Sequence, residues 1–142
     1  MKKIVSILLV IGLVCCLAGT ATAETTVQPR LNNTTAATLV FSIDENGLAE
    51  VVLTCYGECG TMTGVTATTY IEKKTFLFVW SRVDIGTGND VWVDIYAGCD
   101  FIKGHTVQLT SKGTYRAVTE MVVSGSAGAD DVLNIDKEDT YA

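Results

Sequence analysis

The chain has 142 residues, of which 10 are Lys or Arg and 16 are Asp or Glu, so its formal net charge at pH 7 is −6. This acidic balance argues against nucleic acids and anionic membrane surfaces as partners, because both attract clusters of Lys and Arg. The length limits the chain to a single domain once an N-terminal targeting segment is set aside.

Residues 1–23 have the features of a cleaved secretory signal peptide. Lysines stand at positions 2 and 3, an apolar run covers residues 4–17, and Ala-Thr-Ala at 21–23 fits the small-x-small cleavage site. The sequence before Cys16 also loosely resembles a lipoprotein box, which would make that cysteine lipidated. Cleavage after residue 23 would leave 119 residues with 8 basic and 16 acidic side chains, a secreted, extracellular domain with a formal charge of −8.

Short segments that alternate apolar and polar side chains follow a flexible, polar leader at residues 24–37. Alternation with a period of two predicts strands with one buried face, and turns rich in Gly, Asn and Asp separate them. The β domain is expected to span residues 38–136, and the charged tail at 137–142 is expected to fray. The expected strands are residues 38–43, 48–56, 65–74, 76–83, 91–96, 105–110, 115–123 and 132–135.

The most regular alternation lies at residues 115–123, where every second side chain from Tyr115 to Val123 shares one face. In the segment 48–56 the same pattern turns Cys55 inward. The segment 76–83 is a nearly continuous apolar run, which predicts either a strand covered on both sides or an exposed aromatic patch. A loop is expected at 97–104.

Seven or eight short strands and no helical period predict an all-β domain. The architecture expected is a two-sheet antiparallel sandwich. A closed barrel is the alternative, because the number of strands does not exclude it.

Three sequence motifs carry a resemblance to a known group of proteins. TTYIEKK precedes a strand with WSRV, and QLTSKGTYRAVTEMVVSG follows. This order, within about Leu39 to Gly125, resembles small secreted, uncharacterised proteins of Gram-positive anaerobic bacteria. The resemblance implies an immunoglobulin-like sandwich in which Tyr115 is a corner tyrosine at the start of its strand. It implies no activity and no cysteine pattern.

Three cysteines remain after signal cleavage, and in an oxidising compartment two of them are expected to pair. In the chain-entropy model a long loop closed by Cys99 is worth ~4 kcal/mol, and a link from Cys55 to Cys59 only ~2 kcal/mol. In an immunoglobulin-like sandwich the loops that carry Cys59 and Cys99 lie at the same end. A disulfide between these two is therefore predicted, although an extra hairpin at residues 76–83 could reverse the ends; Cys55 would then be a buried thiol.

No motif in the sequence predicts an enzyme or a cofactor. His105 is the only histidine, and it begins a strand beside Gly104, where a solvated side chain is the common case. A cluster of Cys, Ser or carboxylate side chains around it would point to catalysis. The cysteine spacing does not favour a zinc site, and the acidic loop at residues 84–90 lacks the full pattern of a calcium loop, so a plain turn is expected.

Four aromatic side chains could form a binding platform for a protein or a glycan, because rigid rings give a large contact area at a small entropic cost. Burial in the core is the simpler interpretation. The function expected is a non-enzymatic extracellular binding or interaction module, and the alternative is a small secreted toxin or bacteriocin-like effector. The aromatic residues are Tyr70, Trp80, Trp92 and Tyr96.

Overall fold

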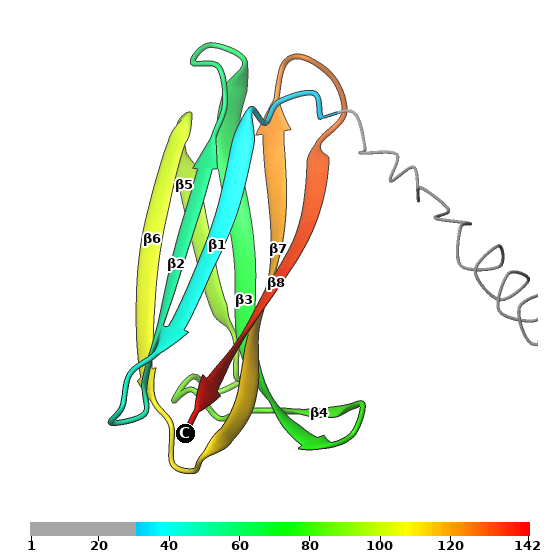
Figure 1. The fold of residues 1–142 in the computed structure, drawn as a ribbon. Coiled ribbons are helices and arrows are strands. Elements are labelled where there is room, and N and C mark those ends of the chain that lie inside the picture. Colours follow the sequence, from blue (N-terminus) through cyan, green and yellow to red (C-terminus); the bar gives the residue numbers. More distant parts are fainter. Residues whose placement is uncertain (1–30) are drawn as a thin grey trace, which may run out of the picture.

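The computed structural model describes residues 31–142, so the expected signal peptide and the first half of the leader lie outside the described residues. Within this range the chain forms eight β-strands, and Figure 1 shows that all but β4 run along the long axis of the domain. The strands are β1 (Ala36–Ile43), β2 (Leu48–Tyr56), β3 (Met62–Phe76), β4 (Val79–Arg82), β5 (Trp92–Ala97), β6 (Asp100–Gln108), β7 (Gly113–Gly125) and β8 (Asp131–Tyr141).

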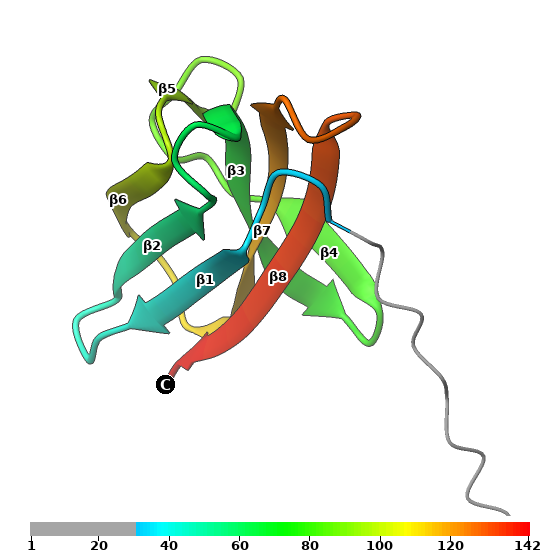
Figure 2. The same cartoon turned by 90° about the horizontal axis from the view of Figure 1, so that it is seen from above.

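The strands form two antiparallel sheets that pack face to face, as the view in Figure 2 shows. One sheet has the order β1-β2-β6. The other has the order β4-β3-β7-β8, with β5 also paired to β3. The groups β1-β2-β6 and β3-β7-β8 correspond to strands A-B-E and C-F-G of an immunoglobulin-like sandwich. The predicted two-sheet sandwich is confirmed, and the barrel is excluded.

Strands β4 and β5 lie along the same edge of β3. Strand β4 pairs with the second half of β3, and β5 pairs with its first half. Both are antiparallel to β3, so together they form one edge strand that is interrupted. At the interruption, residues 83–91 leave the sheet and return to it. The extra hairpin therefore does not reverse the ends of the sandwich.

The core consists of the side chains that the alternating pattern turned inward. On β2, the side chains of Ala49, Val51, Leu53 and Cys55 are fully buried, as predicted. On β7, every second residue from Tyr115 to Val123 is buried in the same way. Two threonines also lie in the core: Thr69 on β3 and Thr119 on β7 are directly paired, and their hydroxyls are 2.8 Å apart. The two threonines thus form a buried polar pair that satisfies itself. Asn33 and Asp131 are the other buried polar residues within the described part of the chain.

Tyr115 has the contact that a corner tyrosine makes. It is buried at the start of β7, and its hydroxyl donates a hydrogen bond to the carbonyl of Ser111, four residues upstream. This bond fixes the connection between β6 and β7 to the core.

The ordered domain is longer at both ends than the sequence predicted. Strand β1 already begins at Ala36, and the backbone N–H groups of Asn32, Asn33 and Thr34 are bonded to the Asp131 carboxylate, so the end of the expected leader belongs to the fold. The expected fraying of the tail at 137–142 is wrong, because β8 pairs with β7 as far as Tyr141. Besides the backbone hydrogen bonds, Tyr141 packs against the core, and the Asp139 carboxylate accepts a hydrogen bond from the backbone N–H of Ile43 on β1.

The prediction of a loop at residues 97–104 is also wrong, because most of these residues belong to a strand. Gly98 has a φ of 149°, a conformation that suits glycine, and it allows a tight turn from β5 into β6. Strand β6 then begins at Asp100 and pairs with β2 over its full length.

Candidate binding surface

The tip of the β3–β4 hairpin is the most exposed apolar feature of the domain. Four consecutive side chains are exposed there: Phe76 by 69%, Leu77 by 63%, Phe78 by 89% and Val79 by 53%. In Figure 1 the hairpin projects sideways from the lower end of the sandwich. An exposed patch, one of the two predicted alternatives, is thus present at residues 76–79, which we call the hairpin tip. The single strand expected at residues 76–83 is wrong, because Leu77 and Phe78 form a turn between β3 and β4.

Behind the hairpin tip, charged and aromatic side chains stack across the outer face of the larger sheet. The Arg82 guanidinium lies 3.5 Å from the centre of the Tyr70 ring, and the Arg116 guanidinium lies 4.4 Å from the centre of the Trp80 ring. Glu72 on β3 lies between Arg82 on β4 and Arg116 on β7, and it forms an ion pair with Arg116 at 2.7 Å. We call these five residues the cation–aromatic ladder. Each contact of this kind is favourable, so the ladder holds the short strand β4 against the sheet.

A cleft of about 720 Å³ lies on the other side of the hairpin. Its floor is polar: Lys73 Nζ donates to Ser111 Oγ at 2.6 Å, and the Tyr115 hydroxyl bonds the Ser111 carbonyl. The cleft therefore offers hydroxyl groups and two basic groups beside an apolar wall. Its lining residues are Lys73, Thr75, Ser81, Arg82, Val83, Asp84, Ile85, Gly86, Val107, Gln108, Leu109, Thr110, Ser111 and Tyr115.

The four aromatic residues proposed as one platform lie in two places. Tyr70 and Trp80 share the cation–aromatic ladder and are partly exposed. Trp92 and Tyr96 lie on β5, where Trp92 stacks on His105 and Tyr96 packs beside the buried Phe101. The predicted surface is thus divided, and its first half lies at the hairpin.

His105 is not the solvated side chain that the sequence predicted. It is partly buried: its ring is parallel to the Trp92 indole at 4.6 Å, and its Nε2 lies 2.6 Å from Asp94 Oδ2. Lys103 adds a weaker contact to Asp94 at 3.6 Å. These side chains connect β5 of one sheet with β6 of the other, where the sandwich has an open side. One carboxylate, that of Asp94, therefore contacts His105, and this contact joins the edge strands of the two sheets.

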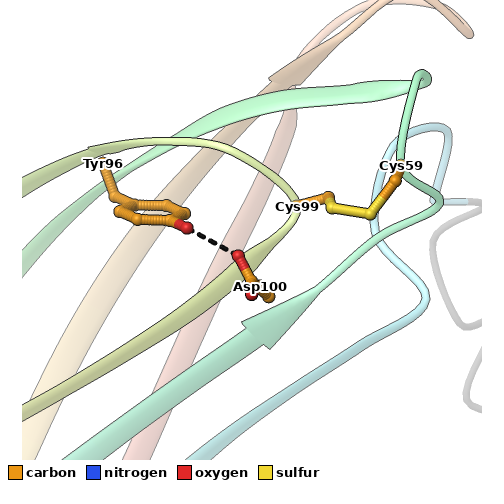
Figure 3. The surroundings of a disulfide bond; sticks show 4 residues. All are labelled: Cys59, Tyr96, Cys99 and Asp100. Carbon is orange, nitrogen blue, oxygen red and sulfur yellow. Dashed lines mark hydrogen bonds between the residues drawn. A yellow bond between two sulfur atoms is a disulfide. The ribbon is translucent and has the colours of Figure 1, made fainter.

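The predicted disulfide between Cys59 and Cys99 is present, and Figure 3 shows it. Its Cα atoms are 5.2 Å apart, and it joins the β2–β3 loop to the β5–β6 turn. Next to it the Tyr96 hydroxyl donates to the Asp100 carboxylate, which raises the pKa of Tyr96. The disulfide occupies two of the three cysteines that a zinc site would need. The third, Cys55, is a buried free thiol, as predicted.

The acidic loop at residues 84–90 forms local turns. Asp84 Oδ1 accepts a hydrogen bond from the backbone N–H of Gly86, and Asp90 has a φ of 55°. Among residues 31–142, no group of three or more His, Cys, Asp and Glu side chains is placed to hold a metal ion. The same part of the chain contains no helix with the length and apolarity needed to cross a membrane.

Comparisons of the chain with protein-family models, with curated proteins and with solved structures return no match.

Proposed function

We propose that this protein is a secreted, extracellular module that binds a partner without catalysing a reaction, and that it binds through the β3–β4 hairpin. The single observation behind this proposal is the hairpin tip, whose four apolar side chains are exposed on a projecting element. Exposed apolar groups that are contiguous mark interaction sites in soluble domains. The disulfide between Cys59 and Cys99 supports an oxidising compartment such as the extracellular space.

The cation–aromatic ladder supports the same surface. Arg and Trp are common among residues that dominate binding energy. Their stacking orders both side chains before a partner arrives, so less conformational entropy is lost on binding.

Binding to intact bacterial cells and to a glycan array tests this proposal. The purified protein should be retained by at least one of them, and Phe78→Asp should abolish retention. Ile95→Asp, which removes an apolar side chain exposed by 80% on β5, is the matched control and should bind normally. Absence of binding to both would overturn the proposal.

The alternative, a small secreted toxin or bacteriocin-like effector, draws on the same tip, because membrane-active proteins also expose apolar groups beside basic ones. Growth inhibition of neighbouring species by the purified protein, lost in Phe78→Asp, would favour it.

A further inference from the structure

We propose that the β3–β4 hairpin docks on the surface of an anionic lipid bilayer, with the hairpin tip entering the interface between headgroups and acyl chains. This inference rests on the proposed function and names the chemical class of the partner. It depends on three features of the hairpin: the apolar tip, the position of Trp80, and the sign of the local charge.

The apolar tip has the shape that shallow insertion needs. Leu77 and Phe78 form the turn, and the flanking Phe76 and Val79 are paired across the hairpin. The Thr75 hydroxyl donates to the Val79 carbonyl, which satisfies one polar group close to the turn. The tip can therefore leave water without unpairing the sheet.

Trp80 directly follows the hairpin tip in the chain and pairs with Lys74 on β3. Tryptophan is enriched at the boundary between the hydrocarbon region and water, where its ring is apolar and its N–H stays hydrated. The Lys74 ammonium lies 5.6 Å from the centre of this ring. Apolar, aromatic and basic groups thus follow one another away from the tip, in the order that the depth of a bilayer interface requires.

The charge at the hairpin is opposite to that of the whole chain. Residues 73–82 contain three basic side chains and no acidic one, although the full chain has 16 acids against 10 bases. The ion pairs found within residues 31–142 use other cations, namely Lys103, His105 and Arg116. The ammonium and guanidinium groups of Lys73, Lys74 and Arg82 are thus free of carboxylate partners there. Lys74 and Arg82, which are exposed, can bind lipid phosphates, and Lys73, which is hydrogen-bonded to Ser111, adds to the local positive charge. Net charge alone therefore does not exclude an anionic surface.

The other exposed apolar side chains of the same sheet lack this arrangement. Strand β5, which carries the exposed Ile95, contains no basic residue, and Val132 on β8 has none within four positions along the chain. These apolar side chains therefore have no neighbouring cation along their strands that could bind an anionic surface. The hairpin combines an apolar tip with adjacent basic groups, which makes it the better match for such a surface.

Sedimentation with large unilamellar vesicles tests the proposal. The purified protein should bind vesicles of equal parts phosphatidylglycerol and phosphatidylcholine, and should bind pure phosphatidylcholine much more weakly. Phe78→Asp should lower binding by at least about tenfold. Lys74→Ala should lower binding by about fivefold, and 0.5 M NaCl should also lower binding. Ile95→Asp and Lys137→Ala, which change exposed residues on other strands, are the matched controls and should bind as the unmodified chain does.

Tryptophan fluorescence gives a second measurement. In a Trp92→Phe background, the emission of Trp80 should shift to the blue with anionic vesicles, and lipids brominated near the headgroup should quench it. Failure to bind anionic vesicles, or equal binding by Phe78→Asp and Ile95→Asp, would overturn the inference. If cells or glycans retain the protein through the hairpin while vesicles do not, the proposed function stands and the partner is a protein or glycan. A dimer in solution that Phe78→Asp dissociates would instead assign the tip to a second copy of the chain.

Discussion

The Asp131 carboxylate accepts a hydrogen bond of 2.8 Å from the backbone N–H of Asn33, a residue 98 positions earlier in the chain. The N–H groups of Asn32 and Thr34 bond the same carboxylate at 2.7 and 2.9 Å. Three consecutive backbone donors thus surround one anion, which is a favourable arrangement for a buried carboxylate. The contact fastens the entry of the domain to the start of β8.

Replacing Asp131 by alanine should therefore destabilise the domain. The variant leaves three backbone donors without their acceptor, and we expect the free energy of unfolding to fall by about 2–4 kcal/mol. Urea denaturation followed by far-UV circular dichroism measures this loss. Asp130→Ala changes the exposed neighbour and should stay within about 0.5 kcal/mol of the unmodified chain. Equal losses in the two variants would show that the contact contributes little.

The same contact predicts the response to acid. Burial by itself raises the pKa of Asp131, but the hydrogen bonds from Asn32, Asn33 and Thr34 outweigh it, so the pKa lies below 3.8. The unfolded chain then binds more protons, so the contribution of Asp131 is complete above the unfolded pKa and is lost as the pH falls through the folded one. Stability should decrease below about pH 4, and less steeply in Asp131→Ala. Parallel pH profiles for the two proteins would contradict this assignment.

The disulfide should contribute strongly to stability. Joint replacement of Cys59 and Cys99 by alanine is expected to lower the free energy of unfolding by about 2–4 kcal/mol, because the unfolded chain regains the freedom of a loop that spans 40 positions. Peptide mapping without reductant should recover a cross-linked peptide that contains these two cysteines. A link from Cys55 to either of them, or three unmodified thiols, would refute the pairing.

Cys55 should be inert in the folded protein. Burial, with a smaller contribution from the charge of Asp131, raises the pKa of the Cys55 thiol from 9.0 to about 11. The folded protein keeps the Cys55 proton to a higher pH than the unfolded chain does. The contribution of Cys55 to stability is therefore complete below the thiol pKa of the unfolded chain, and it is lost as the pH rises toward 11. Iodoacetamide at pH 8 should leave Cys55 unmodified until guanidinium unfolds the chain, as mass spectrometry of its peptide will show. Modification at equal rates in both states would mean that the thiol is accessible.

The buried threonine pair allows a double-mutant cycle. Thr119→Val leaves the Thr69 hydroxyl buried without its partner, so we expect a loss of about 1–3 kcal/mol. Replacing both threonines by valine removes both polar groups and should restore most of that stability. Thermal unfolding of the four proteins gives the coupling energy. Additive losses would show that the two hydroxyls do not depend on each other.

The sequence predicted those parts of the fold in which one face of a strand is buried. The alternation around Val51 on β2 and around Ala117 on β7 identified the core, because burial on one side imposes a period of two. The end of β8 was missed because Asp136 and Glu138 show no apolar pattern, and strand pairing there is a matter of backbone hydrogen bonds to β7. Local patterns contain no information about such a partner.

The candidate site was predicted only in part. The apolar run at 76–83 indicated a special segment, but alternation could not decide whether it is covered. The ladder contact between Arg116 and Trp80, and the pairing of Asp94 with His105, join residues of different strands. Such contacts depend on which strands become neighbours, and no spacing along the chain gives that information.

The interruption between β4 and β5 also affects how the domain avoids aggregation. A single strand along this side of β3 would expose a long row of unpaired N–H and C=O groups, onto which the strand of another molecule could add. The excursion at residues 83–91 divides that row into segments of four and six residues. Each segment offers only a short edge for pairing with another strand, and basic side chains, Arg82 on β4 and Lys74 beside it on β3, lie at the first segment. The break that lets the hairpin project therefore also limits sheet-to-sheet association between copies of the chain.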